Sequence, residues 1–121
     1  MYVYVANAGD CRAICSIKGE LVELSNDHRI SNPTEITRVK NAGGYIEKDR
    51  VNGELTVTRG LGDFSFKRNP YEKKENQIIT AFPEVKKIKR CGIDFIFLGC
   101  DGLWEKKSSQ EMKNYLEMKL K

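Results

Sequence analysis

Three aspartates stand beside glycines where the chain is expected to turn, and each could take part in chemistry. Asp10 follows Gly9, Asp63 closes the segment Arg-Gly-Leu-Gly-Asp63, and Asp101 begins the segment Asp101-Gly-Leu-Trp-Glu105. An aspartate next to a glycine most often hydrogen-bonds to its own backbone in a turn. That is the ordinary interpretation of each aspartate taken alone.

Asp101 differs from the other two because it follows an apolar run, Phe95–Cys100. A carboxylate at the end of a buried strand is costly to desolvate unless a cation or hydrogen bonds compensate. Oxygen ligands favour a hard divalent cation such as Mg²⁺ or Mn²⁺. The neighbouring Trp104 is interpreted as a core residue, and His28 as a loop residue that forms hydrogen bonds. The residues by themselves therefore indicate a metal site at Asp101 and no more.

The first half of the chain is expected to form strands and one helix. The segments 2–8 and 12–17 predict a hairpin about Gly9-Asp10, and residues 21–24 predict a third antiparallel strand. Asn32, Pro33 and Glu35 are typical of a helix start, and Gly43-Gly44 of its end, which predicts a helix over 33–42. Segments 45–51 and 54–58 predict a second hairpin with a type I′ turn at Asn52-Gly53.

The second half is expected to begin with a loop and to end with a helix. Residues 59–77 predict a long loop anchored by Phe64 and Phe66, followed by short strands at 78–82 and 84–88. The apolar segment 94–100 predicts a central strand that is buried on both faces. A capping box at 108–111 predicts a final helix whose apolar stripe consists of Met112, Tyr115, Leu116 and Leu120.

The composition indicates one small globular domain and disfavours several functional classes. The chain has 121 residues, of which 40% are hydrophobic and 31% charged, with a net charge of +4. Basic and acidic residues are mixed along the chain, whereas a nucleic-acid-binding module would concentrate basic charge on one face. Neither a long apolar segment nor a secretory signal pattern is present in the sequence as given. We therefore expect neither a nucleic-acid nor a membrane partner.

The four cysteines, Cys11, Cys15, Cys91 and Cys100, show no metal-binding spacing. They include no C-x-x-C pair, and the single histidine is far from all of them in sequence. This pattern disfavours a tetrahedral zinc site. We expect buried thiols in a reducing compartment, because three of the four lie among strand-like residues.

Several segments together resemble the type 2C family of metal-dependent protein serine/threonine phosphatases. They occur in one order over nearly the whole chain, which makes coincidence improbable. They are Val5-Ala-Asn-Ala-Gly-Asp-Cys-Arg-Ala13, Leu24-Ser-Asn-Asp-His28, Asn41-Ala-Gly-Gly44, Arg50-Val-Asn-Gly53, Val57-Thr-Arg-Gly-Leu-Gly-Asp63, Pro83-Glu-Val85 and Cys100-Asp-Gly-Leu-Trp-Glu105.

The resemblance implies an α+β fold, with two antiparallel sheets packed as a β-sandwich and helices on both outer sides. It implies hydrolysis of phosphoserine and phosphothreonine in phosphoprotein substrates by a water that Mg²⁺ or Mn²⁺ activates. Asp101 matches a ligand of the family's two-metal core, and Asp10 matches a ligand of a third, weaker metal position. Glu105 falls where the family commonly has aspartate at that third position. Arg59 and Asp63 match a segment that we interpret as structural support.

The resemblance also implies how the domain is organised. Residues 1–121 are expected to be a partial phosphatase domain, the C-terminal two-thirds of it, incomplete at both ends. Residues 29–58 match the family's flap, a small subdomain that helps to select substrates. The family's Asp-Gly-His-Gly loop and its late Asp-Asn pair, which supply further metal ligands, have no counterpart here. We therefore expect this chain alone to be inactive.

The oligomeric state, the compartment and two alternative functions can also be stated as expectations. The resemblance implies a monomer in the cytoplasm or nucleus. One alternative is a non-catalytic phosphatase-like remnant that binds phosphoproteins or another partner through the flap. The other, a basic RNA-binding module, is disfavoured by the scattered charge.

Overall fold

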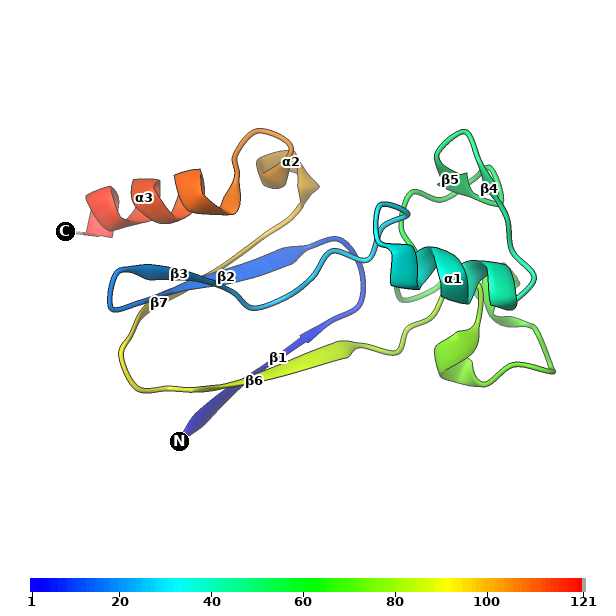
Figure 1. The fold of residues 1–121 in the computed structure, drawn as a ribbon, viewed down its shortest axis with the longest axis horizontal. Coiled ribbons are helices and arrows are strands. Elements are labelled where there is room, and N and C mark those ends of the chain that lie inside the picture. Colours follow the sequence, from blue (N-terminus) through cyan, green and yellow to red (C-terminus); the bar gives the residue numbers. More distant parts are fainter. Residues whose placement is uncertain (121) are drawn as a thin grey trace. The chain divides into compact units, whose positions relative to one another are not determined.

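A computed structural model describes residues 1–120 (Figure 1). The residues group into two compact units, and each is described by itself. The sheet unit consists of residues 1–7, 11–26 and 84–120, and the α1 unit consists of residues 8–10 and 27–83. No helix of the described chain is long and apolar enough to cross a membrane.

The sheet unit contains two antiparallel sheets. Strand β1 (Tyr2–Asn7) pairs with β6 (Glu84–Lys89), while β2 (Arg12–Ile17) lies between β3 (Glu20–Glu23) and β7 (Ile93–Gly99). Ala13, Cys15 and Leu24 form the core between the sheets, and Val5 and Ile88 from the other sheet pack against them. The expected packing of antiparallel sheets with a helix layer is confirmed.

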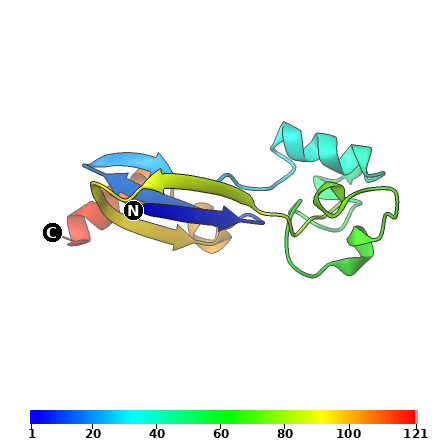
Figure 2. The ribbon, with the colours of Figure 1, turned by 90° about the horizontal axis from the view of Figure 1, so that it is seen from below.

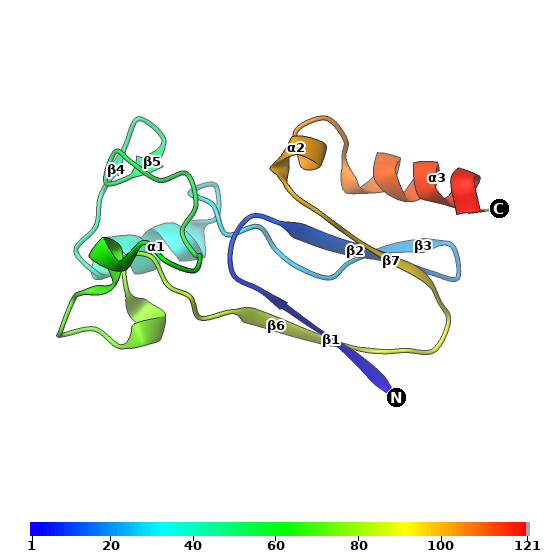
Figure 3. The ribbon, with the colours of Figure 1, turned by 180° about the vertical axis from the view of Figure 1, so that it is seen from behind.

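Helix α3 (Ser109–Leu120) covers the outer face of the three-stranded sheet. It packs against β2 and β3, and it lies on the side of that sheet opposite to β1 and β6 (Figures 1 and 3). The expected capping box is present, because Ser108 N donates to Glu111 Oε2 and Glu111 N donates to Ser108 Oγ. The predicted apolar stripe is partly wrong. Met112 is buried, but Tyr115 is 48% and Leu120 66% exposed.

The outer face of the two-stranded sheet is seen from below in Figure 2, where β1 and β6 lie in front of α3. Tyr2, Tyr4 and Val85 are exposed on this sheet, at 48%, 64% and 59%. Within residues 1–120, the expected helix layer on this side is therefore not formed.

Two strand predictions in the sheet unit are wrong. Segments 2–8 and 12–17 do not form a hairpin, because β1 pairs with β6 and β2 pairs with β3 and β7. Strand β7 is not central, since it lies at an edge of the sheet in the described chain, and Ile96 and Leu98 are 39% and 69% exposed. A local apolar pattern identifies a strand but contains no information about which distant strand becomes its partner.

The α1 unit is built around helix α1 (Pro33–Asn41), which confirms the predicted helix. Asn32 caps it, with Oδ1 accepting from Thr34 N at 3.0 Å. Val39 from α1 packs with Val51 and Ile79 to form the core of the unit, and Phe66 packs against this cluster. Of the two predicted loop anchors, Phe66 is confirmed, whereas Phe64 is 73% exposed.

The short hairpin of the α1 unit turns at a different place from the predicted one. Strands β4 (Ile46–Glu47) and β5 (Arg50–Val51) are joined by Lys48 and Asp49, which both have positive φ. Asn52 and Gly53 also have positive φ, but they form a second turn that closes a bridge between Val51 and Leu55. Lys48-Asp49 and Asn52-Gly53 both adopt turn geometry, so the Asn-Gly motif alone did not determine which residues pair in the hairpin.

The connection from 59 to 83 is irregular with two short 3-10 helices, η1 (Phe64–Lys67) and η2 (Lys74–Asn76). The predicted strand at 78–82 is wrong, because Thr80 forms only a bridge with Arg59. Helix α2 (Asp101–Trp104) follows β7 in the sheet unit.

Candidate functional site

Asp101 lies where β7 ends and α2 begins, as the sequence predicts. Cys100 before it keeps an extended backbone, with φ −99° and ψ −178°. The Asp101 side chain is exposed, and its Oδ1 accepts from Gly102 N at 2.8 Å. The sequence predicted that this carboxylate is buried and needs a cation to compensate its charge. That prediction is wrong for the described chain, because the side chain is exposed. An exposed carboxylate at a strand end remains accessible to a ligand.

Glu105 follows Asp101 by one helical turn. Its backbone N donates to Asp101 O at 2.9 Å, and its side chain is exposed. Residues four apart in a helix lie on the same side, so the two carboxylates share one side of α2. This is the chemical basis for treating Asp101 and Glu105 together.

Trp104 holds α2 against β7. Its Nε1 donates to Gly99 O at 2.7 Å, and its ring meets Phe97 edge to face at 6.0 Å. The guanidinium of Arg12 lies 5.1 Å from the centre of the same ring. A Cβ on Gly99 would come within 3.2 Å of the indole, so glycine permits this close approach. Trp104 is half-buried, so it packs at the contact of α2 with β7 and is not part of the buried core that was expected. These contacts position the Asp101 turn.

Asp10 belongs to the α1 unit, where it forms an ion pair. Its Oδ2 accepts from Arg29 Nε at 2.9 Å, and Arg29 Nη2 lies 2.6 Å from the same oxygen.

His28 is fully buried next to the Gly9-Asp10 turn. Its backbone N donates to Gly9 O at 2.9 Å, and its Nδ1 accepts from Gly9 N at 3.2 Å. His28 therefore holds the Gly9-Asp10 turn, as expected for a hydrogen-bonding residue.

The structure does not test the three predicted metal ligands as a set. Asp101 and Glu105 belong to the sheet unit, and Asp10 to the α1 unit. Across residues 1–120, no group of three or more His, Cys, Asp or Glu side chains is placed to hold a metal ion. The carboxylates of α2 fit a part of a Mg²⁺ or Mn²⁺ site by their chemistry, but they do not complete one.

A buried carboxylate that sequence reasoning missed lies at the centre of the α1 unit. Glu35 is 1% exposed and accepts hydrogen bonds from three side chains. Arg59 Nη2 donates to Oε1 at 2.6 Å, and Arg38 Nη2 and Thr58 Oγ1 donate to Oε2 at 2.8 and 2.7 Å. In the sequence, Glu35 looks like an ordinary acidic residue in the first turn of a helix, so no signal marked it as buried.

The protonation of Glu35 follows from these contacts. Burial raises its pKa, but the hydrogen bonds from Arg59, Arg38 and Thr58 and the charge of Arg38 outweigh burial and lower the pKa to about 2. The carboxylate is therefore ionised at neutral pH. Arg59 also donates to Phe82 O at 3.0 Å, and Arg38 donates to the carbonyls of Gln77 and Ile78. These contacts connect α1 to both ends of the long loop, which agrees with the supporting role expected for Arg59.

Asp63, the other expected support residue, is exposed at the start of η1. Its backbone is left-handed, with φ 48°, and its carbonyl accepts from Phe66 N at 3.0 Å. Aspartate tolerates this conformation better than most residues do. A role for its side chain stays a prediction.

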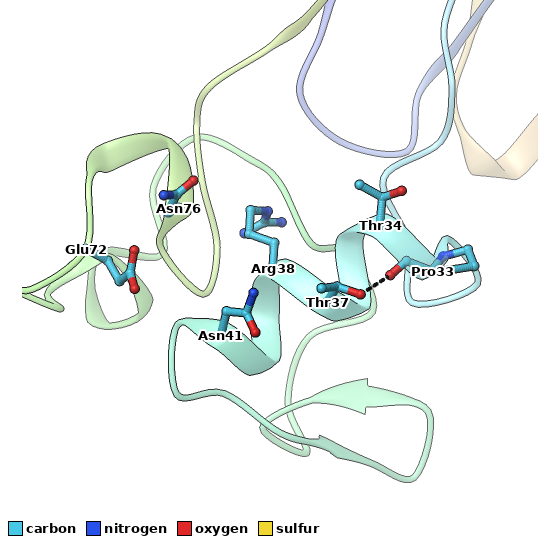
Figure 4. Close-up of a pocket in the computed structure, with 7 residues that line it drawn as sticks. All are labelled: Pro33, Thr34, Thr37, Arg38, Asn41, Glu72 and Asn76. Atoms are coloured by element: carbon cyan, nitrogen blue, oxygen red, sulfur yellow. Dashed lines mark hydrogen bonds between the residues drawn. The ribbon is translucent and has the colours of Figure 1, made fainter.

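A pocket of about 580 Å³ opens beside α1 (Figure 4). Thr34, Thr37 and Asn41 line it from the helix, and Glu72 and Asn76 line it from the long loop. Thr37 Oγ1 donates to Pro33 O at 2.9 Å, so this hydroxyl also bonds within the helix. The pocket adjoins the segment 29–58 that was expected to be the flap.

Comparison with known proteins identifies the family of the chain. The model of the family Protein phosphatase 2C matches residues 1–118. A probable protein phosphatase 2C from Caenorhabditis elegans is 46% identical over 98% of this chain and 33% of its own length. A probable protein phosphatase 2C from Arabidopsis thaliana is 41% identical over 98% of this chain and 34% of its own length.

Solved structures agree with the sequence comparison. A phosphatase from a pathogenic strain of Toxoplasma gondii has a TM-score of 0.82 and 34% identity, and the match covers 98% of this chain and 38% of that one. The chain belongs to the protein phosphatase 2C family. It spans about a third of the length of the curated relatives it matches.

Proposed function

We propose that this chain contributes to a protein serine/threonine phosphatase that hydrolyses phosphoserine and phosphothreonine with Mg²⁺ or Mn²⁺. The observation that carries the proposal is the Asp101 turn, in which a family motif is placed at an exposed strand end beside a second carboxylate, Glu105. The family match and the names of the relatives support the same activity.

In this proposal Asp101 is a ligand of the core metals, and Glu105 and Asp10 belong to a third metal position. When bound, Mg²⁺ or Mn²⁺ supplies Lewis-acid activation of the attacking water and offsets negative charge on the phosphoryl oxygens. The residues of this chain hold and orient the Asp101 carboxylate. Trp104 fixes α2 on β7, and Gly102 N donates to Asp101 Oδ1.

The proposal assigns substrate selection to the flap, residues 29–58. The pocket beside α1 supports it, because hydroxyl and amide side chains line a surface accessible to a peptide. Phosphoprotein substrates are the proposed partners.

The experiment replaces Asp101 by asparagine in a chain extended at both ends to the domain length of its relatives. The substitution removes charge with little change in shape, so phosphatase activity at limiting Mn²⁺ should fall by about 100-fold or more. Glu20→Gln is the matched control, since Glu20 is an exposed acidic residue of β3, outside both the flap and the proposed metal ligands. It also removes one charge with little change in shape. Equal activity of Asp101→Asn and Glu20→Gln would contradict the proposal.

The second candidate function is a phosphatase-like binding module without turnover. The pocket beside α1 favours it, because the residues that line this pocket include none of the predicted metal ligands. Binding of a phosphopeptide by the extended chain, without phosphate release at any Mn²⁺ concentration and with no effect of Asp101→Asn, would favour the module over the enzyme.

A further inference from the structure

Cys11 and Cys100 each lie one residue beyond the last pair that joins β2 and β7. Strands β2 and β7 are antiparallel, with Arg12 opposite Gly99 and Ala13 opposite Leu98. Cys11 precedes the start of β2 and Cys100 follows the end of β7, so extending the same register by one step gives Cys11 and Cys100 as the next opposite pair. Both residues belong to the sheet unit, both are exposed, and both are thiols in the structure.

The spacing of such a pair suits a disulfide. Residues directly opposite in antiparallel strands have Cα atoms about 4.5 or 5.5 Å apart, and disulfides span Cα separations of about 4.4 to 6.8 Å. β7 ends at Gly99, but the backbone of Cys100 is also extended, with φ −99° and ψ −178°. Side chains alternate along a strand, so Cys11 shares a face with Ala13, and Cys100 shares that same face with Leu98.

The other two cysteines do not compete for this partner. Cys15 is buried in the core between the sheets. Cys91 is exposed before the start of β7, whereas Cys100 follows its end. The extended strand between them separates Cys91 from Cys100 by more than about 20 Å. The expectation of buried thiols is wrong for Cys11, Cys91 and Cys100. Of the four cysteines, Cys11 and Cys100 are the two that adjoin the paired residues Arg12 and Gly99.

We propose that Cys11 and Cys100 form a reversible cross-strand disulfide when the protein meets hydrogen peroxide. One thiol sulfur attacks a peroxide oxygen, the O–O bond breaks, and a sulfenic acid and one water form. The second thiol sulfur attacks that sulfenic sulfur, forming the S–S bond and releasing a second water. The two sulfurs together lose two electrons to the peroxide, and the two thiol protons leave in the water molecules. A dithiol reductant restores both thiols by exchange.

The disulfide would join the residue after Asp10 to the residue before Asp101. The bond itself requires neither metal nor turnover, so it does not rest on the proposed function. An effect of the disulfide on phosphatase activity would depend on the proposed function. The experiment below therefore measures only whether the disulfide forms.

The test treats the 121-residue chain with a small excess of hydrogen peroxide, blocks remaining thiols with N-ethylmaleimide and digests with trypsin without reductant. Cleavage after lysine and arginine leaves Cys11 in peptide 1–12, but it leaves both Cys91 and Cys100 in peptide 91–106. The digest is therefore repeated with Cys91→Ser, which makes the assignment to Cys100 unambiguous. Mass spectrometry detects the linked peptides.

We expect peptides 1–12 and 91–106 to be linked in the parent chain and in Cys91→Ser, and separate in Cys11→Ser and Cys100→Ser. The link should form at least about tenfold faster in the native chain than in concentrated guanidinium chloride, because the fold holds the two sulfurs together. A dominant link from Cys11 to Cys91 would overturn the proposal. Equal rates in native and denaturing buffer, or oxidation without a link, would also overturn it.

Discussion

Glu35 shows how one buried charge can organise a whole unit. Arg59, Arg38 and Thr58 bond to its carboxylate, and the two arginines also bond to carbonyls of the loop that follows. Breaking a buried ion pair by removal of one partner costs about 3–5 kcal/mol, because the remaining charge stays buried without compensation. The position should therefore matter for the stability of the α1 unit.

We expect Glu35→Gln to reduce the free energy of unfolding at pH 7 by about 3 kcal/mol, because Arg38 and Arg59 lose their buried countercharge. Urea denaturation of the extended chain measures it. Glu54→Gln is the control, since Glu54 is exposed in the same unit. A stability equal to that of Glu54→Gln would show that the network contributes little.

The same carboxylate predicts a pH dependence. The folded pKa of about 2 lies below the ordinary value of 4.5, so the contribution of Glu35 is fully present above pH 4.5. It is lost as the pH falls from 4.5 towards 2, and it corresponds to a free energy on the order of 3 kcal/mol. The stability difference between the parent chain and Glu35→Gln should shrink over this range. A constant difference from pH 6 to pH 3 would contradict the assignment.

Glu105 predicts an altered metal dependence. Glutamate places its carboxylate about one methylene further from the backbone than the aspartate common in the family, and Mg²⁺ tolerates displaced ligands poorly. In the extended chain, Glu105→Asp should shift the metal concentration that gives half-maximal activity. Activity titrations with Mg²⁺ and Mn²⁺ measure the shift, and superimposable curves would rule out a role in metal binding.

At the scale of elements, the turn after α1 is determined by close packing. A Cβ on Gly44 would lie 2.9 Å from Val39 Cγ1, 3.0 Å from Val39 O and 3.1 Å from Ile78 Cγ2. Val39 is fully buried and one of the close atoms is its backbone oxygen, so it cannot easily move away. Glycine at this position therefore allows the end of α1 to pack against the irregular segment near Ile78.

We expect Gly44→Ala to destabilise the chain by about 1–3 kcal/mol, the usual cost of overpacking a core. Thermal unfolding followed by circular dichroism measures the change. Gly60→Ala is the matched control, because a Cβ there meets nothing within 4 Å. That control should be neutral or stabilising by a few tenths of a kcal/mol through reduced unfolded-state entropy. Equal melting temperatures for both variants would refute the packing argument.

At the scale of the whole molecule, the sheets of the described chain leave apolar surface exposed. Leu98 on β7 is 69% exposed, and Tyr4 on β1 is 64% exposed. Strand edges and exposed apolar patches favour association between chains. The 121-residue chain by itself should therefore be less stable and more prone to aggregation than a chain of the length of its relatives.

We expect residues 1–121 alone to have no appreciable phosphatase activity. Two-metal catalysis needs carboxylates that hold both ions at a fixed separation, and Asp101 cannot do so alone. The measurement compares phosphopeptide hydrolysis by the purified short chain and by the extended chain at millimolar Mn²⁺. Turnover by the short chain at a similar rate, sensitive to Asp101→Asn, would contradict the prediction.

Local chemistry made several features of this protein predictable from its sequence. Helix α1 was predicted because Asn32 accepts from an unpaired N–H at the helix start, Pro33 has no N–H to leave unpaired, and the glycines that follow let the chain turn at the helix end. The Ser108–Glu111 capping box was predicted for the same reason. The ordered motifs, including Asp101-Gly-Leu-Trp-Glu105, were sufficient for the family, because they are contiguous in the chain.

Contacts between distant segments were decided only by the tertiary structure. The pairing of β1 with β6, the edge position of β7 and the pairing of Arg12 with Gly99 all join segments that are far apart in the chain. The Glu35 network likewise joins α1 to residues more than twenty positions away. The residue pattern of a strand or helix shows which of its faces is apolar. It does not show which distant segment will cover that face, because the partner is the one whose packing buries the most apolar surface in the complete fold.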